Sequence, residues 1–538
     1  MAFRKRVGRL GRGVPATVRP VSIPASVGGI NARDSLMMMP PQDCIYTYNL
    51  IPSEYGLRLR KGFREWATGV PSDVRTVLPY DSQEGVTTKD RLFAVCAEGI
   101  YDVTFFNTTA PAQVVDFTPS GPDPDGGYGV WTHFTTDDSD RLVLYADSKN
   151  GLHQYNGDSQ VWSVPAINNV DPADVAFVSA HKQRIWLVEA GSEDAWYLPV
   201  DAIAGDAVKF NFGSKFVHGG RLMGVWSWSV DGGDGFDDVL VAVSRAGDVL
   251  VYYGSDPSQP DWSLRGSYFV GEVPNSRRIT VEDGGDFYIL SIYGLTSLKD
   301  LLSGVNATTT GQGPASKIAR FLREQVDSKA DSQDWNVVTY PGDGFLQIQT
   351  PWQGYNEVAR QFTMNLSTKA WGWWLGVPML SSASWRQEFL IGGPDGIVYI
   401  YDGGLDNTQL SGELGLPIEF KTLTSFQTYG EHAQFMRPHF IRSIGIVAGV
   451  TTVNTQAVFD YAIDQVIPLP PALPGSSSNL WDTGLWDVDY WDFSLGSGSV
   501  PLGSAGLGRT MAIGLAGSSE QRVTVVGWDV MFDTGGLL

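Results

Sequence analysis

Apolar and polar positions follow one recurring pattern along most of the chain. A short apolar run rich in β-branched and aromatic residues leads to a turn containing Gly, Asp or Asn, and a second run then ends in Tyr, Trp or Val. The pattern predicts strand hairpins that start at Arg91, Arg141, Arg184, Val239, Asp286, Gly344 and Glu388. These starts lie about 43 to 58 residues apart, a spacing that suits one four-stranded propeller blade per repeat.

The first strand of each hairpin is apolar at nearly every position, as in strands that are buried on both faces. Blades stacked around an axis give this burial, because each sheet packs against its two neighbours and most edges are shielded. The 62 Gly, 30 Pro, 18 Trp and 21 Tyr also favour short strands joined by tight turns. We therefore predict an all-β protein with a β-propeller of six or seven blades over residues 67–415. A pair of β-sandwiches is the main alternative, because the repeat spacing is uneven.

One segment has helical periodicity instead. In SKIARFLREQV, apolar residues recur at helical spacing and Ser316 is a candidate N-cap. The segment interrupts the repeat between two predicted blades, so we expect a helix on a face of the propeller. Such a helix either covers the core or docks a partner.

The blade pattern ends near residue 415, and we predict an additional C-terminal β-rich platform domain over residues 416–538. Within it, three tryptophans stand five residues apart, at Trp481, Trp486 and Trp491. A period of five fits neither helix nor strand, so we expect a turn-rich segment anchored by its indoles. Oxygen ligands for a hard cation are present nearby, at Asp487, Asp489 and Asp492, but the EF-hand pattern is missing.

The charge is distributed unevenly. The formal net charge of -21 makes the body a poor binder of nucleic acid, because phosphate binding requires Lys and Arg. The same sign suits a wall past which DNA slides, and it equally suits ordinary solubility. The first nineteen residues contain no acid, and their basic side chains are Arg4, Lys5, Arg6, Arg9, Arg12 and Arg19. We expect residues 1–27 to form a basic arm that orders on an acidic partner or on DNA, with a solvated tail as the alternative.

The two cysteines, Cys44 and Cys96, exclude a disulfide framework, and we interpret both as small buried hydrophobes. No apolar run is long enough to span a bilayer, and the basic N-terminus lacks the apolar core of a signal peptide. We therefore expect a soluble protein that is made in the cytoplasm.

The usual hydrolase, zinc and nucleotide motifs are absent: the chain has no HExxH, GxSxG, Walker A or paired CxxC. Its six histidines are dispersed, and only His432 and His439 are close in sequence. We predict no catalytic residue, no cofactor, no metal site and no enzymatic activity. Some propellers are glycosidases with two catalytic carboxylates, but sequence spacing does not show which carboxylates converge.

Residues 28–66 predict an extended strap. The pairs Gly28-Gly29 and Pro40-Pro41 exclude a helix, and the segments 46–51 and 56–60 alternate as short strands do. An irregular loop pinned by its prolines is the alternative. The order GGxNARDSL, MPPxD and N-x-x-P followed by GLxLRKGF resembles the N-terminal signature of the tail nozzle proteins of short-tailed bacteriophages, the tail tubular protein B class.

This resemblance implies a structural virion protein, assembled in the host bacterial cytoplasm, that forms the distal nozzle ring of a short phage tail. Six copies would surround a channel for genome ejection, dock on the adaptor ring beneath the portal and lie near tail fibres or spikes. Double-stranded DNA would pass transiently, without specific binding. A closed ring requires a heterologous interface, in which two different patches of the same chain meet. A glycan-binding adhesin and a propeller-type depolymerase are the alternatives.

The partner contacts that we expect fall in three groups. The arm would meet an acidic partner through Arg4, Lys5, Arg6 and Arg9. The strap would hold the subunit in place through Arg33, Asp34, Arg58, Arg60 and Lys61, with local pairing inside one subunit as the alternative. The platform would contribute Trp481, Trp486 and Trp491.

Overall fold

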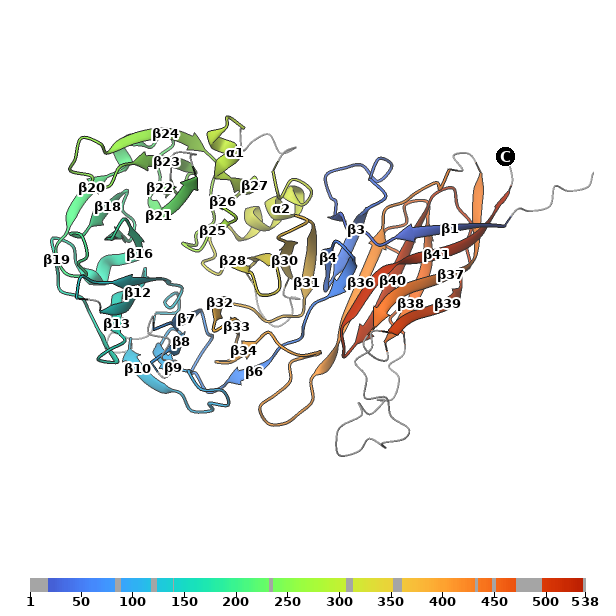
Figure 1. Cartoon of the computed structure of the whole chain (residues 1–538), viewed down its shortest axis with the longest axis horizontal. Coiled ribbons are helices and arrows are strands. Elements are labelled where there is room, and N and C mark those ends of the chain that lie inside the picture. Colours follow the sequence, from blue (N-terminus) through green and yellow to red (C-terminus); the bar gives the residue numbers. More distant parts are fainter. Residues whose placement is uncertain are drawn as a thin grey trace, which may run out of the picture.

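A computed structural model of the chain describes residues 18–82, 89–117, 123–138, 140–231, 236–305, 313–351, 360–430, 434–447, 451–470 and 496–535. These residues form a propeller and a sandwich that lie side by side along the long axis of the molecule (Figure 1). The prediction of an all-β propeller with an additional C-terminal β-rich domain is confirmed.

Seven antiparallel blades surround the propeller axis (Figure 1), and the sixth of them is part of a larger sheet. The first two blades are β7 (Thr76–Tyr80), β8 (Arg91–Val95), β9 (Gly99–Asp102) and β10 (Ala112–Asp116), then β11 (Val130–Thr135), β12 (Arg141–Asp147), β13 (Gly151–Asn156) and β14 (Val161–Ser163). The third and fourth are β16 (Val175–His181), β17 (Arg184–Glu189), β18 (Asp194–Tyr197) and β20 (Val208–Asn211), then β21 (Leu222–Asp231), β22 (Phe236–Ser244), β23 (Asp248–Tyr253) and β24 (Ser263–Phe269).

The fifth blade has three strands, β25 (Thr280–Asp283), β26 (Asp286–Ser291) and β27 (Gly294–Ser297). The sixth is formed by β28 (Asn336–Tyr340), β29 (Phe345–Gln349), β30 (Arg360–Asn365) and β31 (Trp371–Leu375). The seventh is formed by β32 (Ser381–Trp385), β33 (Glu388–Gly392), β34 (Val398–Ile400) and β6 (Arg64–Ala67). A small parallel pair, β15 (Ile167–Asn168) and β19 (Gly205–Asp206), accompanies the third blade.

The seventh blade closes the ring with a strand from the other end of the propeller sequence. Strand β6 pairs antiparallel with β34, so that Ala67 lies opposite Val398 and Arg64 opposite Ile400. The apolar cluster around this pair combines residues of the first and seventh blades, such as Leu92 and Leu390. Closure therefore buries the apolar faces of both terminal blades.

The sandwich consists of two facing sheets. One contains β1 (Val18–Pro24), β4 (Leu50–Ser53), β5 (Gly56–Leu59), β37 (Phe435–Val447), β39 (Gly496–Gly503) and β41 (Val523–Gly535). The other contains β36 (Leu416–Thr424), β38 (Thr452–Phe459) and β40 (Met511–Ser519), with β35 (Leu405–Asp406) beside β36. Their shared core includes Ile23, Leu57, Phe420, Ile513 and Trp528. The strap and β1 thus supply strands to a domain whose other strands come from the end of the chain.

Strand β3 (Asp43–Tyr48) joins the two domains. It pairs in parallel with β31 of the sixth blade, at Tyr48 and Trp373, and antiparallel with β36 of the sandwich. The short strand β2 (Gly29–Ile30) pairs with β3 as well. One ten-stranded sheet therefore runs from the sixth blade into the sandwich, and the strands predicted in the strap are confirmed.

The predicted helix is α2 (Ala319–Lys329), which lies between the fifth and sixth blades and buries Leu322 and Val326. Ser316 is not its N-cap, because the helix begins later, with Ile318 at that position and no side-chain cap. A second helix, α1 (Leu298–Leu302), was not predicted, since five residues are too few for a periodic pattern. Two 3₁₀ turns, η2 (Pro172–Asp174) and η3 (Gly213–Lys215), complete the helical elements of the described ranges.

Candidate functional site at the domain junction

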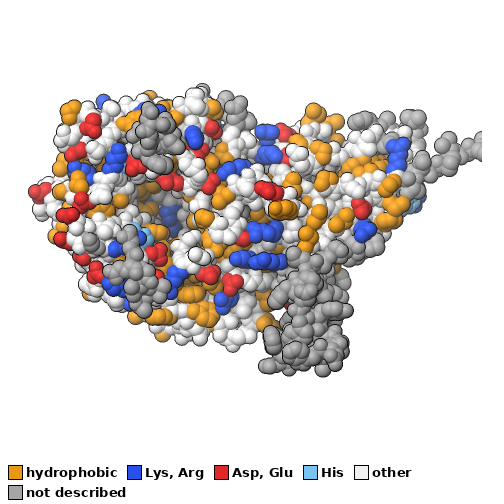
Figure 2. Space-filling view, viewed as in Figure 1, with side chains coloured by type: hydrophobic (Ala, Val, Ile, Leu, Met, Phe, Trp, Pro, Cys, Tyr) orange, Lys and Arg blue, Asp and Glu red, His pale blue; other side chains and the backbone are white. Residues whose placement is uncertain are grey.

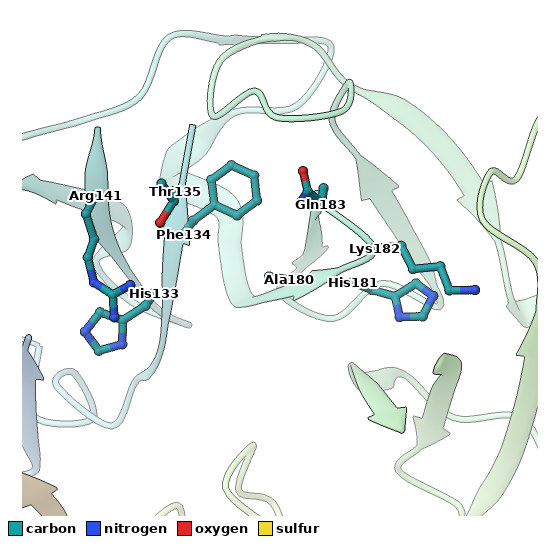
Figure 3. Close-up of a pocket in the computed structure, with 8 residues that line it drawn as sticks. All are labelled: His133, Phe134, Thr135, Arg141, Ala180, His181, Lys182 and Gln183. Atoms are coloured by element: carbon teal, nitrogen blue, oxygen red, sulfur yellow. The ribbon is translucent and has the colours of Figure 1, made fainter. Parts of the chain in front are cut away.

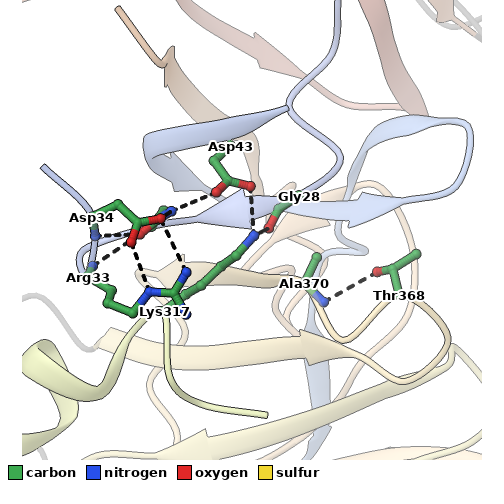
Figure 4. A network of polar contacts seen from close by, with 8 residues as sticks. Gly28, Arg33, Asp34, Asp43, Lys317, Thr368 and Ala370 are labelled. Atoms are coloured by element: carbon green, nitrogen blue, oxygen red, sulfur yellow. Dashed lines mark hydrogen bonds and ion pairs between the residues drawn. The ribbon is translucent and has the colours of Figure 1, made fainter. Parts of the chain in front are cut away.

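The first half of the strap motif forms a polar network beneath β3 (Figure 4). The Asn31 side-chain amide donates to Asp34 at 2.8 Å and to Asp43 at 2.7 Å, and its oxygen accepts the backbone N–H of Asp34 at 3.0 Å. The Lys317 ammonium, just before α2, lies 2.7 Å from the other Asp43 oxygen and 3.1 Å from the Gly28 carbonyl. The Asp43 carboxylate is fully buried, so this ion pair fixes the strap to the propeller.

Two glycines of the motif are required by close packing. A Cβ at Gly28 would stand 2.1 Å from a carboxylate oxygen of Asp43. Gly29 has a φ of +71°, and a Cβ there would stand 2.6 Å from the backbone N and O of Trp371. The GG pair therefore lets β2 lie directly against the sixth blade.

The second half of the motif forms a buried ion pair. Both terminal nitrogens of Arg60 lie 2.6 Å from the carboxylate oxygens of Asp406, and Nε donates to the Asn49 side chain at 3.0 Å. The Arg60 side chain has no exposed surface. Asn49, whose φ is +60°, also accepts the N–H of Leu375 and donates to the carbonyl of Glu419. The blade, the strap and the sandwich therefore meet at this pair.

A second ion pair supports the same region. Arg58 lies 2.6 Å from Asp343 in the turn between β28 and β29. Tyr401 donates to Asp343 at 3.2 Å, and Lys61 stands 5.6 Å from the centre of the Tyr401 ring. Burial raises the pKa of Tyr401, so its hydroxyl stays protonated and donates to the carboxylate.

Four of the strap's charged residues that were expected to contact partners thus pair within their own chain, and the fifth, Lys61, lies against Tyr401. Arg58 and Arg60 form the ion pairs above, which is the local pairing left as the alternative. Arg33 and Asp34 pair with each other at 2.9 Å, and hydrogen bonds from Arg33 and Asn31 lower the pKa of Asp34 to about 2. The remaining expected contacts lie outside the described residues: Arg4, Lys5, Arg6, Arg9, Trp481, Trp486 and Trp491.

Sequence reasoning did not single out several residues of this junction. Asn31 and Asn49 stand inside the recognised motif, and two polar amides amid apolar strand residues were a usable signal. Asp343, Asp406 and Lys317 were not linked to the strap, because each lies far from it in sequence and an ion pair leaves no local pattern.

Residues that precede the first strands of four blades contact one another at one end of the propeller. Arg278, which precedes β25 of the fifth blade, donates to the Arg75 carbonyl at the start of the first blade, 2.9 Å away. The Tyr128 ring lies 4.9 Å from the Arg75 guanidinium and 6.0 Å from that of Arg278, and its hydroxyl bonds to Asp334 of the sixth blade. Burial raises the pKa of Asp334 and lowers that of Arg278. These four residues form a plug that links the first, second, fifth and sixth blades.

A pocket of about 340 Å³ lies between the second and third blades (Figure 3). His133 and Arg141 stand side by side on one wall, and Ala180 and His181 are on the other (Figure 3). Burial lowers the pKa of His133 and of His181 to about 4, so both imidazoles are neutral at pH 7. His181 is within 2.9 Å of the Ser227 hydroxyl. The pocket offers no carboxylate pair for glycoside hydrolysis among its described lining residues.

The structure also describes the cysteines, one of the two histidines that are close in sequence, and the potential metal ligands. Cys44 and Cys96 are buried free thiols, as predicted. His439 lies 2.6 Å from Asp533 in the sandwich, whereas His432 is outside the described residues. No group of three potential metal ligands occurs among the residues described. Within the same ranges, neither helix has the length and apolar character to cross a membrane.

No family model matches the chain, and no curated protein matches its sequence. Solved structures resemble it weakly. The WD40 β-propeller domain of Doa1 has a TM-score of 0.36 at 11% identity, covering 64% of this chain and 97% of that one. The computationally designed Ika8 protein gives 0.34 at 8% identity, covering 63% and 99%. The extracellular domain of a one-component system of B. thetaiotaomicron gives 0.40 at 8% identity, covering 77% and 53%. Likeness at this level carries no argument about function.

Proposed function

We propose that the chain is a structural virion protein that forms the distal nozzle ring of a short phage tail. One observation carries this proposal: the residues that resemble the nozzle signature build the junction between propeller and sandwich. Asn31, Asp43 and Arg60 hold the two domains together through buried contacts. A motif whose residues form a rigid junction between two domains suits a protein that bears load in an assembly.

In the proposed ring, the DNA channel lies between copies and not along a propeller axis. The plug around Arg278 supports this arrangement, because side chains of the first, second, fifth and sixth blades meet across the axis. A propeller axis closed in this way does not admit a duplex. The net charge of -21 suits a lumen wall, since like charge keeps DNA from adhering.

The ring would contain six copies, dock on the adaptor ring beneath the portal and lie near tail fibres or spikes in the mature virion. A ring of this kind uses one patch of each copy against a different patch of the next. The basic arm would meet an acidic surface of the adaptor through Arg4, Lys5, Arg6 and Arg9.

A cryo-electron reconstruction of purified virions tests the proposal. We expect this chain to trace into six-fold density at the tail tip, with the DNA path on the six-fold axis and every propeller axis closed. A peripheral trimer, or a different protein in the tip density, would contradict the nozzle assignment. The adhesin and depolymerase alternatives would then be tested by glycan binding and by capsule digestion with the purified chain.

A further inference from the structure

An amine and an amide meet at one buried carboxylate in the polar network beneath β3. Asp43 Oδ1 accepts from the Lys317 ammonium at 2.7 Å, and Asp43 Oδ2 accepts from the Asn31 side-chain amide at 2.7 Å. Asn31 is 2% exposed, and Asp43 has no exposed surface. The Lys317 side chain is 30% exposed, and its nitrogen also donates to the Gly28 carbonyl at 3.1 Å (Figure 4). The Asp43 carboxylate thus bridges two groups that come from distant segments of the chain.

The backbone holds the two segments together at this point. The Ala32 N–H donates to the Lys317 carbonyl at 2.8 Å, and the Asn31 N–H donates to the Cys44 carbonyl at 3.0 Å. The adjoining apolar residues are buried in one cluster, to which Ile30, Cys44 and Ile318 belong. Groups that are held side by side in a fixed geometry react with each other far more readily than free groups do, because most of the entropic cost has already been met.

The carbonyl oxygen of the Asn31 side chain accepts two backbone N–H groups. They belong to Arg33 at 3.1 Å and to Asp34 at 3.0 Å. Asparagine makes such contacts in ordinary turns, but here they also surround the oxygen on which negative charge develops when an amine attacks the amide carbon. A nucleophile, a proton carrier and two oxyanion-stabilising donors therefore converge on one amide.

We infer that Lys317 and Asn31 become joined by an isopeptide bond. Asp43 takes a proton from the Lys317 ammonium, and the free amine attacks Cγ of Asn31. The backbone N–H groups of Arg33 and Asp34 stabilise the negative charge on Oδ1. Asp43 then gives its proton to Nδ2 and takes the second proton from the attacking nitrogen. The Cγ–Nδ2 bond breaks and ammonia leaves, so that an amide joins the two side chains without any oxidant or cofactor.

The bond fastens the strap covalently to the residues that precede α2. It encloses the first five blades in a closed loop of the chain, because their strands all lie between Asn31 and Lys317. A cross-link that closes a long loop stabilises a fold mainly by restricting the unfolded chain. The reaction takes place within one copy, so it does not depend on the proposed ring. The space-filling view in Figure 2 shows the junction across which this bond would hold the two domains.

Mass spectrometry of the denatured full-length chain tests the bond. We expect the measured mass to be lower than the mass calculated from the sequence by one molecule of ammonia. Trypsin should release a branched peptide that joins the segment ending at Arg33 to the segment ending at Arg320, without cleavage after Lys317. A full calculated mass, or a loss of ammonia without this peptide, would overturn the inference. Loss of one molecule of water would overturn it as well, because Asp43 and not Asn31 would then be the acyl partner.

Two substitutions separate the roles of the amine and the carboxylate. Lys317→Arg keeps the positive charge but removes the amine, and Asp43→Asn keeps the size of the side chain but removes the proton carrier. Both variants should have their full calculated masses, and both should migrate more slowly than the unsubstituted chain on denaturing gels, because their chains contain no closed loop. Lys369→Arg is the control, since Lys369 also lies 2.7 Å from a carboxylate, that of Asp283, and its mass should still be lower by one ammonia.

Ammonia loss that persists in the Lys317→Arg chain would contradict the assignment of the amine. If either variant fails to fold, the mass and the branched peptide of the unsubstituted chain still decide the question.

Discussion

The ion pair between Arg60 and Asp406 provides a sharp test of how the junction is held. Its guanidinium is completely buried, and the Asp406 side chain is 19% exposed. Removing one member of a buried pair typically costs about 3 to 5 kcal/mol, because a charge is left without its partner. The partial exposure of Asp406 places the expected cost of Asp406→Asn near the lower limit, at about 3 kcal/mol.

The matched control is Asp402→Asn. Asp402 lies 3.2 Å from Arg64, and the two side chains are 49% and 38% exposed. An exposed pair contributes about 0.2 to 1 kcal/mol, since water and salt screen it. The two substitutions change the same chemical group, a carboxylate, in positions four residues apart, and they differ mainly in the burial of the cation.

Hydrogen exchange measures the difference locally. The amides of Gly62 and Phe63 donate to the carbonyls of Gly403 and Leu405, so their protection reports opening of this part of the junction. A loss of about 3 kcal/mol corresponds to exchange that is faster by roughly 100-fold, whereas the control should change it by less than about 5-fold. Equal effects of the two substitutions would refute the reasoning, because burial of Arg60 would then carry no energetic weight.

Three further outcomes are expected. Gly29→Ala should destabilise the chain by about 1 to 3 kcal/mol more than Gly376→Ala in urea unfolding. Both glycines have positive φ, but only Gly29 faces the Trp371 backbone. Equal unfolding midpoints of the two variants would contradict this. Burial lowers the pKa of His133 and His181 from 6.5 to about 4, so the folded state binds fewer protons than the unfolded state in that window. Stability should therefore fall as the pH drops from 6.5 to 4, and His181→Gln should flatten this slope in thermal melts; an unchanged slope would exclude the imidazole as its source. Deleting residues 1–17 should reduce incorporation into particles. The melting temperature should not change, because β1 begins at Val18 and is kept. Normal incorporation of the shortened chain would remove the role proposed for the arm.

Local pattern predicted the blades well, because their strands pair with neighbours in sequence. The hairpins that begin at Arg91 and Arg141 correspond to β8–β9 and β12–β13, whose partners follow within a few residues. Pairings between distant segments left no such trace. The strand β6 has only four residues, and nothing in them indicates Val398–Ile400 as the partner. For the same reason the strap charges were recognised but Asp343 and Asp406 were not, since an ion pair between distant residues has no period.

The placement of the first strands has a consequence for synthesis of the chain. Strand β1 pairs with β41, with Val18 opposite Asp533 and Pro24 opposite Gly527. Strand β6 completes the seventh blade only when β34 is present. The N-terminal strands leave the ribosome long before their partners do. The propeller is therefore complete only after Ile400 has emerged, and the sandwich only after β41 has emerged. A product truncated before β41 lacks the strand that receives β1. Translation therefore imposes an order on the two domains, in which the propeller can close before the sandwich does.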